Sequence, residues 1–170
     1  MEELFDIYDE QGNHTGTAPR SQCHGDPRLI HRTCHVVVIH PETGDILLQK
    51  RKMNKDIQPG KWDTAVGGHL ALGEDFETGA RRELAEELGI QEAELFHLFD
   101  SQIRNCIESE NVRVFGTFLS GGFKFDPGEI DDIRFWDRAA LEDPENQSRF
   151  TPNLIEELKL LKNTGKYYPR

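Results

Sequence analysis

The sequence predicts an α/β domain in which a mixed β-sheet lies between helices, and three observations support this. Short runs rich in β-branched and aromatic residues recur between turn residues, a pattern typical of strands. Two longer segments, residues 74–88 and 151–161, carry the apolar spacing and end signals of helices. Strands interleaved with two main helices favour a sheet covered by a helix on each face. With 170 residues and no internal linker, the chain is expected to form a single domain over residues 1–170.

The first half of the chain is predicted to contain two hairpins. Residues 1–33 are expected to form an N-terminal hairpin and loop extension, with its turn at residues 9–12. The second hairpin has a β-branched first strand and turns at residues 41–45. The four predicted strands are residues 4–8, 15–18, 34–40 and 46–50.

The second half is predicted to alternate between strands and helices. A basic loop over residues 51–61, followed by residues 62–66, leads into the segment that holds the first long helix. Thr151 and Pro152 supply an N-cap and a first-turn proline for the last helix. A short helix is expected to start at residues 137–141. The remaining predicted strands are residues 95–107, 112–119 and 132–136.

Residues 68–90 form the segment in which most of the chemistry is predicted to gather. On a helix, side chains three and four positions apart share a face, with about 5–6 Å between Cβ atoms. Glu83, Glu86 and Glu87 therefore project together, and Arg82 lies four positions before Glu86. Like charges at this spacing disfavour a helix. A hard divalent cation bound by carboxylate oxygens would relieve their repulsion, so this face is a candidate metal site.

The rest of this helix is predicted from its apolar stripe and its glycines. Leu84 and Leu88 would pack the helix on a sheet, and Gly89 stands where a C-cap glycine belongs. Gly79 costs about 1 kcal/mol relative to alanine inside a helix. Because it lies one turn before Glu83, it could leave room for a ligand on the carboxylate face. The competing interpretation is a glutamate-rich amphipathic helix on the surface.

A long gapped pattern decides between these interpretations. The positions that define it are Gly68, Glu74, Arg82, Glu83, Leu84, Glu86, Glu87, Gly89 and Ile90. Residues 68–90 resemble the Nudix box of Nudix hydrolases at every defining position. This resemblance implies an α/β/α sandwich and hydrolysis of a small substrate that contains a diphosphate linked to another moiety. It also implies Mg²⁺ or Mn²⁺ as the cofactor.

The resemblance implies a role for each charged residue of the box. Glu86 and Glu87 would be the main metal ligands, and Glu83 would bind the metal or orient a metal-bound water. Arg82 would hold a glutamate in its productive rotamer. Gly68 would supply backbone at the edge of the metal site.

Two further carboxylate roles are left open by the sequence. Glu74 could be a structural carboxylate or a direct metal ligand. The general base of several Nudix enzymes is a carboxylate on a late loop, where this chain offers Glu129, Asp131 and Asp132. The alternative for that run is a solvated acidic turn. The candidate catalytic residues are Glu83, Glu86, Glu87, Arg82 and Glu129.

Basic residues of the loop at 51–61 are candidates for substrate binding. The resemblance brings this loop near the pocket, so Arg51 and Lys55 are expected to meet substrate phosphates, with Lys50 and Lys52 nearby. The alternative is a solvated basic hairpin end.

A second resemblance extends over most of the chain. Two histidines precede the first core strand, a third follows the paired glycines, and two glutamates open a late strand. The chain resembles type I isopentenyl-diphosphate isomerases at these positions, which are metal-binding in that family. They imply a possible second metal site, made of His24, His31, His69, Glu108 and Glu110.

One departure argues against isomerase activity. The isomerase needs a cysteine two residues before the third histidine, and that position is Gly67 in this chain. A glycine has no thiol to move a proton at an allylic carbon. The chain therefore looks like an isomerase-like branch of the Nudix hydrolases, with an isopentenyl-diphosphate isomerase as the alternative function. A non-catalytic Nudix ligand sensor is a third hypothesis, although sensors typically lose box glutamates and none is lost here.

Composition limits the partners and the compartment that are expected. A formal net charge of -11 argues against nucleic-acid polymers, which need clustered basic residues. No apolar run approaches the length of a membrane-spanning helix, and the acidic N-terminus does not resemble a targeting peptide. Three cysteines without a C-x-x-C pattern favour a reducing cytoplasm. The sequence does not indicate an oligomeric state.

Overall fold

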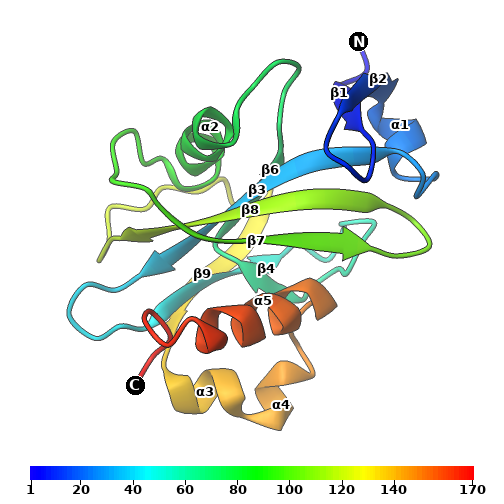
Figure 1. Cartoon of the computed structure of the whole chain (residues 1–170). Helices are drawn as coiled ribbons and strands as arrows, with labels where there is room; N and C mark the ends of the chain where they lie inside the picture. The colour runs from blue at the N-terminus through cyan, green and yellow to red at the C-terminus, as the bar shows by residue number, and fades with distance from the viewer.

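The computed structural model describes residues 1–170 and confirms the predicted α/β fold. A nine-stranded mixed sheet has α2 on one face and α5 on the other, with α3 and α4 beside α5 (Figure 1). The strands are β1 Leu4–Tyr8, β2 His14–Pro19, β3 Ile30–Ile39, β4 Ile46–Arg51, β5 Trp62–Thr64, β6 Val66–His69, β7 Phe96–Arg104, β8 Ser109–Phe118 and β9 Ile130–Trp136. The helices are α1 Arg20–Cys23, α2 Phe76–Leu88, α3 Arg138–Glu142, α4 Pro144–Gln147 and α5 Pro152–Asn163.

Strand β3 organises the sheet. It runs parallel to β8 along its whole length, with Ile30 opposite Ser109 and Ile39 opposite Phe118. Its other edge pairs antiparallel with β6, and its last residue pairs with β4. Strand β4 in turn pairs with β5 and β9. Because β5 pairs with β4 and β6 pairs with β3, the chain changes strand partner at Ala65, and the sheet splits there.

Two hydrophobic clusters lie on opposite faces of the sheet. Leu84 and Leu88 of α2 pack against one face, as the apolar stripe predicts. Leu154, Leu158 and Leu161 of α5 pack against the other face. Alternate residues of β3 therefore face different helices, which gives each face of this strand its own chemistry.

The predicted end signals Gly89 and Thr151 are confirmed, and Asp75 is an additional cap that was not predicted. Asp75 accepts a hydrogen bond from Thr78 N at 2.8 Å and caps α2, and Gly89 ends it in the left-handed region with φ 69°. Thr151 caps α5 through Leu154 N. Helix α2 begins two residues later than predicted, because the cap is Asp75; Glu74 therefore lies in the preceding loop.

The largest difference from prediction is the early start of β3 and β8. Strand β3 begins at Ile30 rather than residue 34, and β8 begins at Ser109 rather than residue 112. Each supplies the other's hydrogen bonds, a pairing between distant segments that local composition does not reveal. His31 therefore lies on a strand, opposite Glu110, rather than in the loop before the strand.

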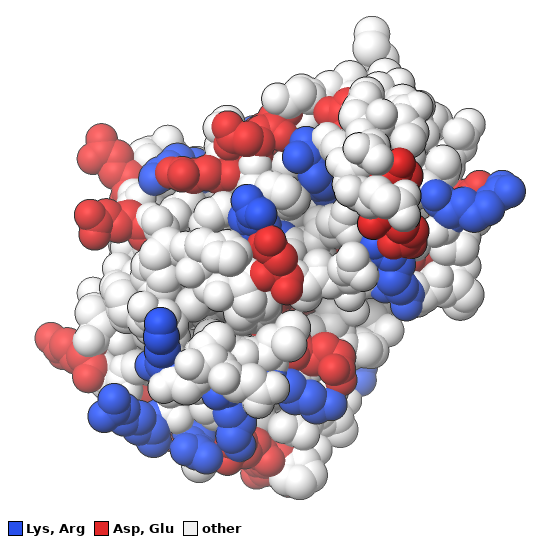
Figure 2. Space-filling model, viewed as in Figure 1, with Lys and Arg blue, Asp and Glu red and all other residues white.

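Smaller differences involve short elements and turns. Helices α1 and α4 have four residues each and were not predicted. Strand β7 ends at Arg104 because the Asn105 side chain accepts from the N–H groups of Ile107 and Glu108 and forms a turn. No helix combines the length and the apolar character needed to span a membrane. Acidic and basic side chains are interspersed on the face shown in Figure 2, without a continuous basic patch.

Candidate functional site

Arg82 organises the loop before α2 and the first turns of the helix. Its Nε and Nη2 atoms each donate at 2.9 Å to a different oxygen of Glu74. Nη1 donates to Glu83 Oε1 at 2.7 Å and to Glu86 Oε2 at 3.3 Å. Since Glu74 also accepts from Ala71 N at 2.8 Å, both of its oxygens are engaged, which favours the structural alternative for this residue.

Glu83 lies directly over Gly68. A Cβ atom on Gly68 would overlap the Glu83 carboxylate, so only glycine allows the helix to seat this close to β6. The Glu83 side chain is 12% exposed. Burial raises its pKa, while the ion pair with Arg82 opposes the rise.

Glu87 lies where the sheet splits. Gln49 Nε2, on β4, donates to Glu87 Oε2 at 2.7 Å and to Ala65 O at 2.8 Å. Burial, followed by the charge of Glu83, raises the pKa of Glu87 to about 8. The hydrogen bond from Gln49 and the nearby backbone of Gly67 oppose this rise in pKa.

The carboxylates of α2 suit a divalent cation chemically. The charge of Glu83 disfavours the ionised form of Glu87, and the charge of Glu86 disfavours the ionised form of Glu83; a bound cation would remove that cost. Glu86 is 59% exposed and available at the rim. Hard oxygen ligands of this kind match Mg²⁺, which retains several of its waters.

The candidate base Glu129 pairs with Lys55, one of the two candidate substrate-binding residues. Glu129 is 67% exposed, and its Oε2 lies 2.7 Å from Lys55 Nζ. Arg51 donates from Nε to Ile57 O at 3.0 Å, and its Nη1 lies 4.0 Å from Asp63 Oδ2. No hydrogen bond or ion pair joins Glu129 to the carboxylates of α2, so these groups are not directly linked in this structure.

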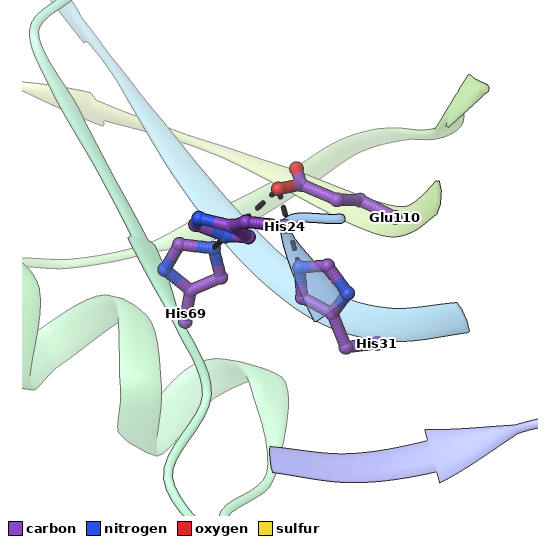
Figure 3. A group of neighbouring side chains, drawn as sticks. All are labelled: His24, His31, His69 and Glu110. Atoms are coloured by element: carbon purple, nitrogen blue, oxygen red, sulfur yellow. Dashed lines mark hydrogen bonds and ion pairs between the residues drawn. The ribbon is translucent and has the colours of Figure 1, made fainter. Parts of the chain in front are cut away.

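Three histidines and a glutamate form a second cluster (Figure 3). One ligand atom from each of His24, His31, His69 and Glu110 lies within 4.8 Å of all the others. It is the one group of three or more histidine, cysteine or acidic side chains in the chain that converges this tightly. The members come from the segment after α1, from β3, from the end of β6 and from β8.

Three of the distances between ligand atoms in this cluster are close to those of a tetrahedral metal shell. Ligand atoms about 2.0–2.1 Å from a zinc ion would be separated from one another by roughly 3.3 Å. His24 Nε2 lies 3.1 Å from His69 Nε2, and Glu110 Oε1 lies 3.4 Å from His31 Nε2 and 3.5 Å from His69 Nε2. His31 Nε2 is buried without a hydrogen-bond partner, and an unsatisfied buried atom of this kind fits a metal ligand.

Surrounding groups fix the cluster. His31 Nδ1 lies 3.4 Å from Leu29 O, which favours a proton on Nδ1 and a free lone pair on Nε2. The Phe5 ring stacks on His31 and His69, with centroids 5.2 and 4.6 Å away. Glu108, the fifth predicted member, lies at the edge, with Oε2 3.6 Å from His24 Nε2.

The pKa values in this cluster follow from burial and from the mutual contacts. Burial lowers the pKa of His24 to about 4 and raises that of Glu108 to about 7. Burial also acts to raise the pKa of Glu110, but its close contacts with His31 and His69 outweigh burial and lower the pKa. A neutral His24 beside an ionised Glu110 is the protonation pattern that a metal requires.

Several residues at these sites were not predicted from the sequence. Phe5 and Gln49 carry no motif, and they reach the clusters only through strand pairing. His35, on β3, contacts Glu157 of α5, with Nδ1 2.5 Å from Oε2. Alternation along β3 was the available signal for His35, because it shares a strand face with His31.

The fold and the sites define a class of protein, an α/β/α sandwich in which a carboxylate-rich helix packs on a glycine-containing strand. The NUDIX domain family model matches residues 30–158. An uncharacterized Nudix hydrolase of Yersinia pestis is 36% identical over 162 residues, covering 93% of this chain and 85% of that protein. The uncharacterized Nudix hydrolase YfcD of Escherichia coli K12 is 33% identical over 165 residues, covering 93% of this chain and 86% of that protein.

Solved structures agree on the fold. The structure of DR0079 from Deinococcus radiodurans superposes with a TM-score of 0.67 at 18% identity, covering 99% of this chain and 93% of that one. The chain therefore belongs to the NUDIX family and is a Nudix hydrolase, similar to the uncharacterized YfcD proteins.

Proposed function

We propose that this Nudix hydrolase cleaves a diphosphate linked to another moiety in a small molecule, with Mg²⁺ or Mn²⁺ as cofactor. The observation that carries the proposal is the pair of carboxylates at the split in the sheet. Glu83 is pressed against Gly68, and burial raises the pKa of Glu87 to about 8. A divalent cation would neutralise the charges of these two carboxylates. The same cation would also neutralise the charge of a diphosphate substrate.

Each residue has a proposed role in the reaction. The cation would neutralise the diphosphate and activate water. Glu83, Glu86 and Glu87 would hold the cation, Gly68 would supply the backbone at its edge, and Arg82 would keep Glu83 in place through the 2.7 Å contact. Water would attack at phosphorus.

Groups outside α2 would complete the site. Glu129 is the proposed general base, and it would have to leave its ion pair with Lys55 in order to act. Arg51 and Lys55 are the proposed substrate-binding residues. A phosphate that attracts Lys55 would release Glu129, so binding and activation would be linked. We propose a cytoplasmic enzyme with small-molecule substrates rather than nucleic-acid polymers.

The isomerase-like cluster is proposed as a second metal site. His24, His31, His69 and Glu110 would bind a zinc-like ion, with Glu108 at its edge. The unpartnered His31 Nε2 supports this site, as does the spacing of the ligand atoms. Isomerisation of isopentenyl diphosphate is disfavoured because Gly67 has no thiol, and a sensor role is disfavoured because every box glutamate is present.

A phosphate-release screen tests the proposed function. Nucleoside di- and triphosphates, nucleotide sugars, dinucleotides and prenyl diphosphates are incubated with the full chain, with and without Mg²⁺ or Mn²⁺. We expect metal-dependent cleavage of at least one diphosphate. Isomerisation of isopentenyl diphosphate without hydrolysis of any compound would overturn the hydrolase assignment.

A further inference from the structure

The imidazole of His35 covers the face of Gly67. The two residues are directly opposed on β3 and β6. A Cβ atom on Gly67 would lie 3.1 Å from His35 Cδ2 and 3.4 Å from Nε2, tighter than ordinary van der Waals contact. The His35 ring therefore occupies the space that a side chain at position 67 would take, and the absence of a side chain on Gly67 leaves room for the ring.

Glu157 fixes the direction in which this imidazole points. Its Oε2 lies 2.5 Å from His35 Nδ1, and its Oε1 accepts from Thr64 Oγ1 at 2.5 Å. Glu157 is 7% exposed, so both oxygens of a buried carboxylate are engaged. With Nδ1 committed to Glu157, only Nε2 remains, and no group of the protein hydrogen-bonds to it.

The ring is charged and partly open to solvent. Burial acts to lower the pKa of His35, but the charge of Glu157 and the hydrogen bond to it outweigh burial and raise the pKa to about 9. The negative charges of Asp63 on β5 and Glu110 on β8 raise the pKa of His35 further. The side chain is 15% exposed. At neutral pH, Nε2 is thus a charge-assisted donor without an acceptor.

Gly67 also connects this donor to the proposed cation site. Its backbone lies close enough to Glu87 to lower the pKa of that carboxyl, and β6 has no strand partner on its other edge. The adjoining residue, Gly68, lies under Glu83. A single residue of backbone therefore has the His35 ring over its face and the Glu87 carboxylate at its edge.

We propose that His35 is a substrate-binding residue, which donates a hydrogen bond from Nε2 to an oxygen of the metal-bound diphosphate above Gly67. Glu157 and Thr64 are positioning residues that hold the ring for this contact. The inference rests on the proposed function, because the cation at Glu87 offsets the acidic surroundings for an anionic ligand. His35 would add a cationic hydrogen-bond donor to a site whose other side chains near Gly67 and Gly68 are the carboxylates of α2.

The test measures binding of methylene diphosphonate, a diphosphate that cannot be hydrolysed, to the full chain in the presence of Mg²⁺. Calorimetry compares the wild type with His35→Gln, Glu157→Gln and the control His97→Gln, whose side chain is 52% exposed and pairs with Asp100 on β7. Loss of a charge-assisted hydrogen bond is expected to weaken binding about 10- to 100-fold in His35→Gln. Glu157→Gln is expected to weaken it less, and His97→Gln not at all.

A second readout needs no substitution. Nitrogen NMR of histidine-labelled wild type is expected to show a shift of the His35 Nε2 signal when the probe binds, while the His97 signals stay in place. Wild-type binding with an unmoved His35 signal would overturn the inference, and so would a dissociation constant for His35→Gln within twofold of wild type. Should His35→Gln fail to fold, the wild-type signal decides.

The same experiment separates this inference from the proposed function. If the wild type does not bind the probe at saturating Mg²⁺, the diphosphate site itself is wrong, and the role of His35 is lost with it. If the wild type binds the probe with its His35 signal unmoved, the hydrolase proposal stands and only the role of His35 is overturned.

Discussion

Arg82 Nη2 donates to the backbone oxygen of His69 at 3.0 Å, and this contact joins the two clusters of the protein. The ring of His69 belongs to the histidine cluster. The guanidinium that binds its backbone also holds Glu74 and Glu83. The segment from His69 to Glu74 is consequently fixed by both clusters, so a change in one is expected to be felt in the other.

Glu87→Gln is expected to lower kcat by at least about a hundredfold, because the amide keeps the shape of the side chain but loses the anionic ligand. The fold should remain, since Gln49 still has an oxygen to which it can donate. Glu77→Gln is the control, an exposed glutamate on the same helix. Turnover near wild type at saturating Mg²⁺, on the best substrate of the screen, would remove Glu87 from the site.

Gly68→Ala is expected to weaken Mn²⁺ binding about 10- to 100-fold, the range seen when groups that support a metal ligand are changed. The added Cβ displaces the Glu83 carboxylate. Gly121→Ala is the matched control, because a Cβ there meets nothing within 4 Å. Titration of both variants with Mn²⁺, followed by electron paramagnetic resonance, measures the difference. Equal affinities would mean that Glu83 does not bind the cation.

The histidine cluster is expected to bind about one zinc ion, with nitrogen and oxygen atoms roughly 2.0–2.2 Å from the metal by X-ray absorption. Zinc at a hundred times its dissociation constant should stabilise the fold by about 2.7 kcal/mol, seen as a rise in Tm. His24→Ala should lose most of this stabilisation and His97→Ala none. A Tm that zinc leaves unchanged in the wild type would contradict a metal site.

The stability of the metal-free protein is expected to fall as pH rises from 6.5 to above 9. The folded state raises the pKa of His35 from 6.5 to about 9, so it binds a proton that the unfolded chain releases near 6.5. The stabilisation is complete below pH 6.5 and is lost as pH passes about 9, with a size on the order of 3 kcal/mol. Urea unfolding at several pH values should show this slope in wild type and in His97→Gln. His35→Gln should show a smaller fall, because the raised pKa of Glu87, about 8, acts in the same direction up to that pH. An identical slope would disprove the attribution.

Gly67→Cys is not expected to create isomerase activity, because a thiol alone supplies neither the opposing acid nor a pocket shaped to a prenyl chain. Hydrolase activity of the variant is expected to fall. Backbone strain is not the reason, because Gly67 has no positive φ. The new Cβ instead meets the His35 ring at 3.1 Å. Assays with isopentenyl diphosphate and with the best hydrolase substrate check both outcomes, and Gly121→Cys is the control. Isomerisation by the variant would show that only the thiol is missing.

The sequence by itself determined the features that depend on neighbours along the chain. The carboxylate face of α2 follows from helical spacing, and its end follows from Gly89. The Thr151–Pro152 start of α5 was equally visible. These predictions succeed because caps and helical faces are set by residues within one or two turns.

Tertiary structure alone decided how the sites are completed. Gln49 reaches Glu87 across 38 positions, and His35 reaches Glu157 across 122. Neither contact leaves a pattern among neighbouring residues of the sequence, because strand pairing and helix packing bring these side chains together. The early start of β3 has the same origin, since β8 supplies its hydrogen bonds. Gly67 was visible in the sequence as a missing thiol, but only the paired strands place an imidazole over it.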